Sequence, residues 1–232
     1  MSKLAFEWHR LFLVPSADGT APVLVGPQGT ARALVMELRR APDWELLARV
    51  WQGVQAELDL PAPAIAVSGT DAMQLWFSLA EPITAAQGQA FLDGLRQRFL
   101  PEVDARRLRL LPTPDLQHAQ PVPAAQADTG NWSAFVAPDL APVFGDTPWL
   151  DIPPNEEGQA SLLRGIAVIK KAAFEAAWQT LGGSAPAVRP PAPDAGGDPV
   201  RFLRRVMDDE SVPMGLRIEA AKALLPYSGQ RG

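Results

Sequence analysis

Residues 62–80 read APAIAVSGTDAMQLWFSLA, two apolar runs joined by the polar turn Ser68-Gly69-Thr70-Asp71. A short turn of this composition between two strand-like runs predicts a β-hairpin. Gln74 is the exception within the second run, because it is a neutral amide among apolar and aromatic residues. It occupies either an outward-facing strand position or a position where chemistry would require an ionisable group.

Helices and strands alternate on both sides of this hairpin. Apolar residues three and four apart predict a helix over residues 44–58, and the capping box of Thr84 and Gln87 opens a second helix over residues 84–99. The sequence also predicts strands at residues 5–14, 21–26, 31–40 and 106–112. This order is typical of an α+β protein of the split β-α-β type, ferredoxin-like or RNA-recognition-like, in which two helices cover one face of an antiparallel sheet.

The chain beyond this α+β domain, which we assign to residues 1–115, changes character three times. Residues 116–182 are rich in Trp and Pro and end in a helix predicted over residues 156–181, so we expect them to pack on the domain. Residues 183–198 have the Pro, Gly and Ala content of a flexible linker. Residues 199–228 then predict a C-terminal pair of helices.

Composition excludes several classes of protein. The 232 residues include no cysteine and only two histidines, which excludes disulfides and thiolate metal sites and leaves too few ligands for a zinc centre. No apolar run is long enough to span a bilayer, and the N-terminus lacks the pattern of a secretory signal, so we expect a cytoplasmic protein without membrane contact. Residues 112–182 are acidic, with 3 Lys and Arg against 8 Asp and Glu.

The hairpin and its surroundings, residues 30–115, resemble the archaeo-eukaryotic primase superfamily of primase-polymerases. VSGTDAMQLWFSL is similar to the family's hairpin motif, and EVDARRLRLLPTP is similar to its third motif. The resemblance implies nucleotidyl transfer with Mg²⁺ or Mn²⁺ held by carboxylates, here Glu37 and Asp104. It also implies nucleotide contacts from the hairpin and the last strand. In this chain those positions are Ser68, Gly69, Gln74 and Arg109.

Two positions depart from the family pattern. Gln74 stands where the family has a histidine, and Arg39 stands where the second carboxylate of the metal pair would lie. An arginine cannot ligate a metal ion and would repel it. The departures favour a catalytically degenerate, nucleic-acid-associated accessory protein of a mobile element, with no cofactor. An active primase-polymerase would need rearranged ligands such as Glu7 or Asp18, and a third hypothesis is a protein-binding adaptor without DNA binding.

Each of these residues also has an ordinary structural interpretation. Asp104 could simply charge the surface after a helix, Glu37 could be an outward strand residue, and Gln74 could face solvent. The arginines close to the third motif, Arg106 and Arg107, are candidate phosphate contacts or a solvated face. What distinguishes the primase hypothesis is the order and spacing of all these residues together.

The C-terminal segment carries a second resemblance. DPVRFLRRVMDDESVPMGLRIEAAKALLPY is similar to a helical segment of small terminase subunits and related proteins of phages and mobile elements. The resemblance implies DNA contact or oligomerisation, so the partner of these helices is either DNA or a protein. The candidate nucleic-acid contacts in this segment are Arg201, Arg204, Arg205, Arg217 and Lys222.

Overall fold

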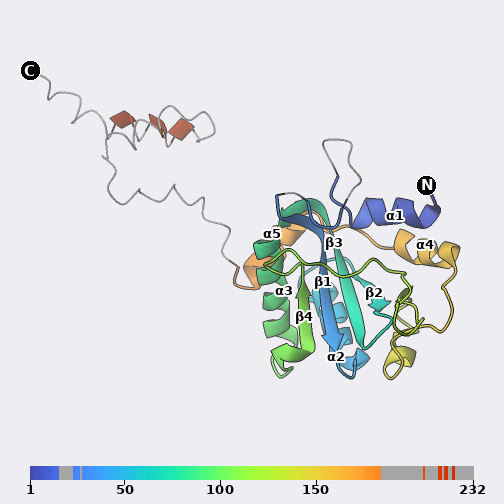
Figure 1. Cartoon of the computed structure of the whole chain (residues 1–232). Coiled ribbons are helices and arrows are strands. Elements are labelled where there is room, and N and C mark those ends of the chain that lie inside the picture. The colour runs from blue at the N-terminus through green and yellow to red at the C-terminus, as the bar shows by residue number, and fades with distance from the viewer. Residues whose placement is uncertain are drawn as a thin grey trace, which may run out of the picture. The chain divides into compact units, whose positions relative to one another are not determined.

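The structure, a computed structural model, describes residues 1–15, 23–26 and 28–183, and in the C-terminal part residues 206, 214, 215, 217, 218, 221 and 222. The chain divides into two compact units, Met1–Ala185 and Pro186–Gly232. It is an α+β protein with a five-stranded antiparallel sheet packed against helices in the first unit and helical residues in the second (Figure 1). None of the helices in the described ranges is long and apolar enough to cross a bilayer.

Five strands form the sheet in the order β4-β1-β3-β2-β5, and every neighbouring pair is antiparallel. The strands are β1 (Thr30–Arg39), β2 (Ala64–Val67), β3 (Ala72–Thr84), β4 (Leu108–Leu111) and β5 (Ala134–Val136). Helix α2 (Trp44–Ala56) connects β1 to β2, and α3 (Ala85–Phe99) connects β3 to β4. The predicted hairpin, the two predicted helices and the strands predicted at residues 31–40 and 106–112 are therefore confirmed.

Helices α2, α3 and α5 (Lys171–Thr180) cover the first face of the sheet. Aliphatic residues of β1 and β3 alternate toward this face, as the two-residue period of a strand requires. The Phe91 ring of α3 lies between Phe77 of β3 and Phe174 of α5, with ring centroids 6.3 and 4.8 Å away. This face carries the larger of the two apolar cores.

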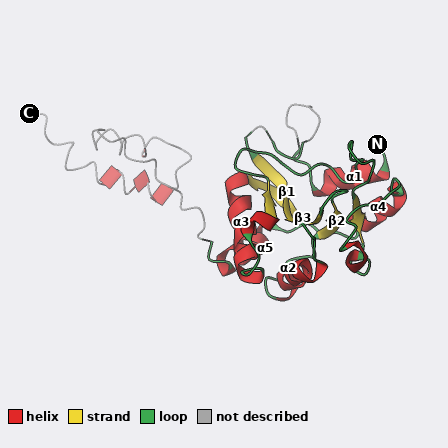
Figure 2. Ribbon diagram, turned by 60° about the horizontal axis from the view of Figure 1, so that its bottom comes forward, coloured by secondary structure: helices red, strands yellow, loops and turns green. Residues whose placement is uncertain are grey.

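Helices α1 (Lys3–Leu11) and α4 (Glu156–Arg164) cover the second face, so the sheet lies between two sets of helices (Figures 1 and 2). The expectation that helices cover only one face is wrong. Eight consecutive residues of β3, Ala72–Leu79, are buried, which requires apolar cover on both sides. Trp8 of α1 packs edge-on against Trp76 of β3 with ring centroids 5.4 Å apart.

The strand predicted at residues 5–14 is wrong, because these residues mostly form helix α1. Leu4, Trp8 and Leu11 recur at helical spacing and are buried, while the Ser2 hydroxyl caps the helix by accepting a hydrogen bond from the amide of Ala5. Of the strand predicted at residues 21–26, the described residues 23–26 form isolated bridges at Val23 and Val25, and residues 21 and 22 lie outside the described ranges. The alternation of large residues over 5–14 therefore reflects the buried stripe of helix α1 together with the exposed aromatic residue Phe6.

The single helix predicted over residues 156–181 is also wrong, because it is interrupted between α4 and α5. The backbone amide of Ile169 donates to the carbonyl of Ser78 at 2.7 Å, and the amide of Ala80 donates to the carbonyl of Ile169 at 2.9 Å. This short extended link to β3 carries the chain from the second face of the sheet to the first. A continuous helix could not supply those backbone groups.

The edge strand β5 was not predicted, and its free edge is closed by a side chain. Phe135 donates its amide to Gln159 Oε1 at 2.7 Å, and Gln159 Nε2 donates to the carbonyl of Phe135 at 2.9 Å. One buried amide of α4 thus occupies both outward backbone groups of Phe135. This arrangement prevents the edge from pairing with another strand at that residue.

Candidate nucleic-acid interface

Three sequence-predicted residues form one row across the sheet. In the strand register Glu37 of β1 lies opposite Gln74 of β3 on one side and opposite Arg109 of β4 on the other. Paired residues of neighbouring strands point to the same face, so all three side chains belong to the second face. The row therefore brings together three of the six residues that the primase resemblance placed in one site, and Asp104, Ser68 and Gly69 lie outside it.

The carboxylate of Glu37 is buried and held by two neighbours. Gln74 Nε2 donates to Glu37 Oε2 at 2.7 Å, and Arg39 Nε lies 3.5 Å from Oε1. Trp76 Nε1 donates to Gln74 Oε1 at 2.8 Å, which fixes the orientation of the amide. Glu37 and Gln74 are only 7% and 4% exposed, so the interpretations that Glu37 points outward and that Gln74 faces solvent are wrong.

The residues around Glu37 do not fit a divalent metal ion. A carboxylate pair one residue apart would place a second acid at position 39, where Arg39 instead pairs with Glu37 and, at 3.7 Å, with Asp71. Within the described ranges no three His, Asp or Glu side chains gather closely enough to hold a metal. Of the two carboxylates considered as replacements, Glu7 is buried on α1 and lies 2.6 Å from Arg10. Asp18 lies outside the described residues.

The turn at Ser68 and Gly69 uses its polar groups internally. Ser68 Oγ accepts hydrogen bonds from the amides of Thr70 and Ala72 at 3.1 and 3.0 Å. The amide of Gly69 donates to the carbonyl of Pro148 at 3.0 Å. A phosphate group could accept a hydrogen bond from the amide of Gly69 only after the bond from this amide to the carbonyl of Pro148 was broken.

Asp104 has a local structural role. Its side chain caps the short 3₁₀ turn Ala105–Arg107 by accepting from the amide of Arg106 at 2.8 Å, and it lies 3.6 Å from Arg106 Nε. It is exposed and precedes β4, whereas the residue opposite Glu37 is Arg109. The structure therefore places Asp104 outside the Glu37–Gln74–Arg109 row.

The arginines of the third motif lie beside the end of β1. Because β1 and β4 are antiparallel and Leu38 pairs with Leu108, the end of β1 meets the start of β4. Arg107 Nη2 donates to the carbonyl of Ala41 at 2.9 Å, which joins the two segments. We call the resulting group the arginine edge. It consists of Arg39, Arg40, Arg106, Arg107 and Arg109.

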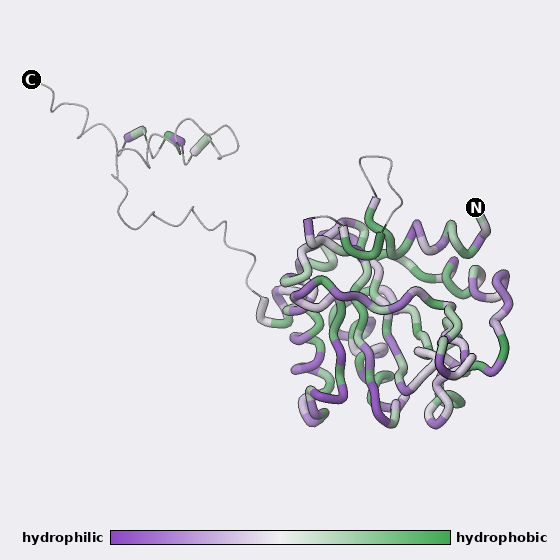
Figure 3. Tube along the Cα trace, viewed as in Figure 1, coloured by the Kyte–Doolittle hydropathy of each residue, from purple (hydrophilic) through white to green (hydrophobic). Residues whose placement is uncertain are grey.

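Sequence reasoning missed Arg40 as a member of this edge. A usable signal was present, because the segment Glu37–Arg40 ends one strand and the segment Arg106–Arg109 begins its predicted neighbour. Arg40 has a left-handed backbone with φ of 57° and is exposed, and Figure 3 shows hydrophilic residues gathering at these strand ends. Pairing the two strands would have joined both arginine groups.

The arginine edge is only partly neutralised. Arg39 is paired with Glu37 and Asp71, and Arg106 with Asp104. Within the described part of the chain no carboxylate lies within ion-pair distance of Arg40, Arg107 or Arg109. Arg107 Nε is moreover buried without a hydrogen-bond partner. This edge is therefore locally basic in a chain of net charge −5.

His118 anchors the segment that follows β4 against the second face. His118 Nε2 lies 3.0 Å from the carbonyl oxygen of Ala33, and Nδ1 accepts from the amide of Ala119 at 2.8 Å, so the neutral ring carries its proton on Nε2. Burial lowers the pKa of His118 below its usual value, and the nearby positive charge of Arg109 acts in the same direction. The ring lies 5.9 Å from that of Trp76.

The C-terminal candidates are only partly described. Arg201, Arg204 and Arg205 lie outside the described residues. Arg217 and Lys222 are helical, Arg217 being half-buried and Lys222 exposed within their unit. Both are candidate nucleic-acid contacts, and each already interacts with another group of the protein.

No protein-family model matches this chain, and the search of curated proteins finds no match either. The residues and their geometry therefore carry the functional proposal.

Proposed function

We propose that this protein is a catalytically degenerate relative of the archaeo-eukaryotic primases that binds DNA through the arginine edge, as an accessory factor of a mobile element. The strand order β4-β1-β3-β2, with α2 and α3 on one face, agrees with the split β-α-β, RNA-recognition-like arrangement that this family implies. The hydrogen bond that Gln74 donates to Glu37 is the main support for a loss of catalysis. Glu37 is the one carboxylate that the chain keeps from the family's metal-binding pair, and this bond occupies it.

DNA binding is supported by the unpaired arginines of the same edge. Arg40, Arg107 and Arg109 can each approach a phosphate without first leaving a carboxylate of the described residues. Phosphate contacts of this kind fix a protein on the backbone without reading sequence. The proposed activity is therefore sequence-independent binding of the DNA backbone.

The test compares two matched triple variants on labelled single-stranded and duplex oligonucleotides. Replacing Arg40, Arg107 and Arg109 with Gln should weaken binding of the oligonucleotides. The slope of log affinity against log salt concentration, measured between about 50 and 200 mM salt, should become less steep by about 2 to 3. Replacing Arg49, Arg96 and Arg98 removes the same charge from residues already paired with Glu102, Asp93 and Glu57. That control should bind like the unmodified protein.

Two results would contradict the proposal. Failure of the full chain to bind either oligonucleotide at low salt would favour the protein-binding adaptor. Primer extension with Mn²⁺ and deoxynucleotides that disappears in Asp104→Ala would favour an active primase-polymerase instead. We expect binding without extension.

A further inference from the structure

The turn that follows β1 has two consecutive residues with a left-handed backbone. Arg40 and Ala41 have φ of 57° and 65°, and neither is a glycine. A residue with a Cβ pays free energy for this conformation, because the Cβ comes too close to the following carbonyl oxygen. Ala41 also precedes Pro42, and a proline favours an extended backbone in the residue before it. The turn is therefore strained at adjacent positions, and contacts with its surroundings must hold it in this form.

Two hydrogen bonds hold the strained turn. The amide of Arg40 donates to the carbonyl of Asp71 at 3.2 Å, and Nη2 of Arg107 donates to the carbonyl of Ala41 at 2.9 Å. The second bond comes from a side chain of the arginine edge, the surface that we propose for DNA. The conformation of the turn and the position of one proposed phosphate contact are therefore coupled.

The guanidinium of Arg107 is not yet placed for a two-point phosphate contact. An arginine binds a phosphate most strongly through two parallel N–H···O bonds, and a side-on contact of this kind uses Nε and Nη2. In Arg107 the Nε is buried without a hydrogen-bond partner, and Nη2 donates to Ala41. A side-on phosphate contact therefore requires the guanidinium to turn away from the Ala41 carbonyl. The same movement gives Nε an acceptor, which removes the cost of a buried donor without a partner.

We propose that the hydrogen bond from Arg107 to the Ala41 carbonyl is a latch that DNA opens. In the free protein Arg107 holds the turn in its left-handed form. When a DNA phosphate binds Arg107, the Ala41 carbonyl loses its donor and the turn relaxes to negative φ. This inference rests on the proposed DNA binding and adds a conformational control to it.

The latch links the strain of the turn to the affinity for DNA. The apparent affinity is lowered by the fraction of molecules in which the latch is closed. A substitution that favours the left-handed turn must therefore weaken DNA binding, and a substitution that disfavours it must strengthen DNA binding. A turn that only positioned the arginines for DNA would show the opposite signs.

Two substitutions of Ala41 test these signs on a labelled single-stranded oligonucleotide. Ala41→Gly keeps the carbonyl and removes the strain, since glycine adopts a left-handed backbone readily. It should weaken binding about fivefold, which corresponds to about 1 kcal/mol. Ala41→Val should strengthen binding by about the same factor, because a β-branched residue strongly disfavours positive φ. Unchanged binding by Ala41→Gly together with weaker binding by Ala41→Val would overturn the latch.

Two controls separate the latch from general effects of the substitutions. Asp59 also has a left-handed backbone, with φ of 51°, and follows the far end of α2, a helix about 20 Å long. Asp59→Gly makes the same backbone change there and removes a negative charge, so it should not weaken DNA binding. In the second control, Arg107→Ala removes the latch itself. Combined with Arg107→Ala, both Ala41→Gly and Ala41→Val should leave the affinity for the oligonucleotide unchanged.

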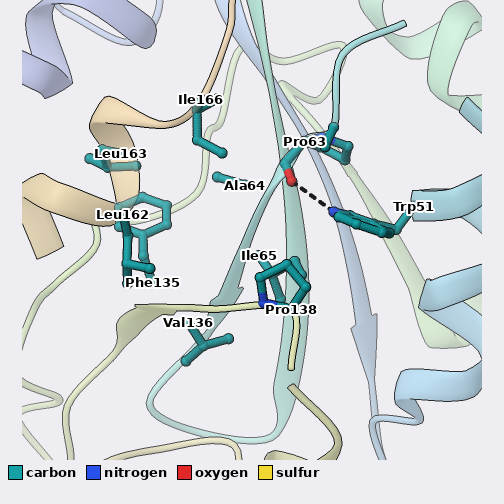
Figure 4. Close-up of a pocket in the computed structure, with 11 residues that line it drawn as sticks. Trp51, Pro63, Ala64, Ile65, Phe135, Val136, Pro138, Leu162, Leu163 and Ile166 are labelled. Carbon is teal, nitrogen blue, oxygen red and sulfur yellow. Dashed lines mark hydrogen bonds between the residues drawn. The ribbon is translucent and has the colours of Figure 1, made fainter. Parts of the chain in front are cut away.

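The NMR signal of the Arg107 Nε–H group observes the latch directly in the full chain. Assigned from Arg107→Lys, this signal should exchange slowly with water in the free protein, because the atom is buried, and should shift when the oligonucleotide is added. The indole signal of Trp51 is the internal reference. Its Nε1 donates to the carbonyl of Pro63 at 3.1 Å in an apolar pocket beside β2 and β5 (Figure 4), and it should not shift.

The outcomes distinguish the latch from the proposed function. If the unmodified chain does not bind the oligonucleotide, the proposed DNA binding and the latch are both wrong. If it binds while the Arg107 signal stays in place and Ala41→Gly binds as tightly as the unmodified chain, only the latch is wrong. Binding with a shifted Arg107 signal and opposite effects of Ala41→Gly and Ala41→Val is the result that we expect.

Discussion

Gln74 donates a 2.7 Å hydrogen bond from its side-chain amide to the buried carboxylate of Glu37 across β3 and β1. The pair is completed by Trp76, which donates to the amide oxygen, and by Arg39, which lies beside the carboxylate. A histidine with a role in phosphate binding would have to leave Glu37 free for a metal ion. Gln74 instead donates a hydrogen bond to this carboxylate. The residue at the position of the family's histidine therefore contributes to the packing of the sheet.

Replacing Gln74 with Glu should place two carboxylates face to face in a buried site. At pH 7 we expect a loss of roughly 2–4 kcal/mol in the free energy of unfolding, because like charges at this distance cannot both remain ionised without cost. One carboxyl of the variant then has a raised pKa when folded. The loss should therefore shrink as the pH falls toward about 4, where the unfolded chain also binds the proton.

The matched control for this variant exchanges the two groups. Glu37→Gln combined with Gln74→Glu keeps one carboxylate and one amide, and Trp76 can still donate to position 74. The double variant should recover most of the stability lost in Gln74→Glu, as measured by urea denaturation. If the double variant is as unstable as the single one, the hydrogen bond is not the reason for the loss.

His118 should make stability depend on pH near neutrality. Its pKa is lowered in the folded protein by burial, so the unfolded chain binds a proton at a higher pH than the folded one. The contribution of neutral His118 to the free energy of unfolding is fully present above the pKa of about 6.5 that histidine has in the unfolded chain. It declines as the pH falls through that value, until the lower pKa of the folded protein is reached. Urea denaturation between about pH 7.5 and 5.5 measures this decline.

The variant His118→Asn tests the assignment to this residue. Asparagine can still accept the hydrogen bond that the amide of Ala119 donates to Nδ1, but it does not titrate. The variant should lose the pH-dependent decline, whereas His9→Asn, which removes the other histidine, should retain it. A decline that persists in His118→Asn would assign the effect to other groups.

Local patterns predicted the elements that a sequence can specify locally. The apolar stripe of α2, the Thr84–Gln87 capping box of α3 and the turn between β2 and β3 each depend on residues close together in the chain. Helix α1 was also within reach of the sequence, since Leu4, Trp8 and Leu11 repeat at helical spacing. The prediction failed there because Phe6, between Leu4 and Trp8, gives the segment the alternation of large residues that is typical of a strand.

Other features depend on residues that are distant in the sequence. Strand β5 is completed by Gln159, which follows it by more than twenty residues, and the buried state of Gln74 depends on Glu37 of another strand. No local sequence pattern predicts either contact, because the two residues of each pair come together only when the sheet and its helices assemble. The arginine edge is intermediate, since pairing the two predicted strands places Arg40 beside Arg107.

Replacing Gln159 with Ala should expose the edge of β5. The amide and carbonyl of Phe135 would lose both partners, and we expect a loss of about 1–3 kcal/mol in the free energy of unfolding. The open edge should also promote self-association, which sedimentation velocity can measure at increasing protein concentration. Gln52→Ala, at an exposed position of α2, is the control and should change neither quantity. A variant that stays as stable and as dispersed as the original protein would show that Gln159 does not protect this edge.

Two glycine-to-alanine substitutions should have opposite effects on stability. In α2 a Cβ at Gly53 would overlap Cε1 of the Phe99 ring, so Gly53→Ala must push α3 away or rotate a packed ring. We expect a loss of about 1–3 kcal/mol in the free energy of unfolding. In α4 a Cβ at Gly158 meets only the Asn155 side chain, at 3.8 Å or more. Gly158→Ala should therefore stabilise the protein by about 0.5–1 kcal/mol through helix propensity alone. Thermal and urea unfolding of both variants would measure the difference, and a neutral Gly53→Ala would mean that α2 and α3 do not pack as closely as this contact requires.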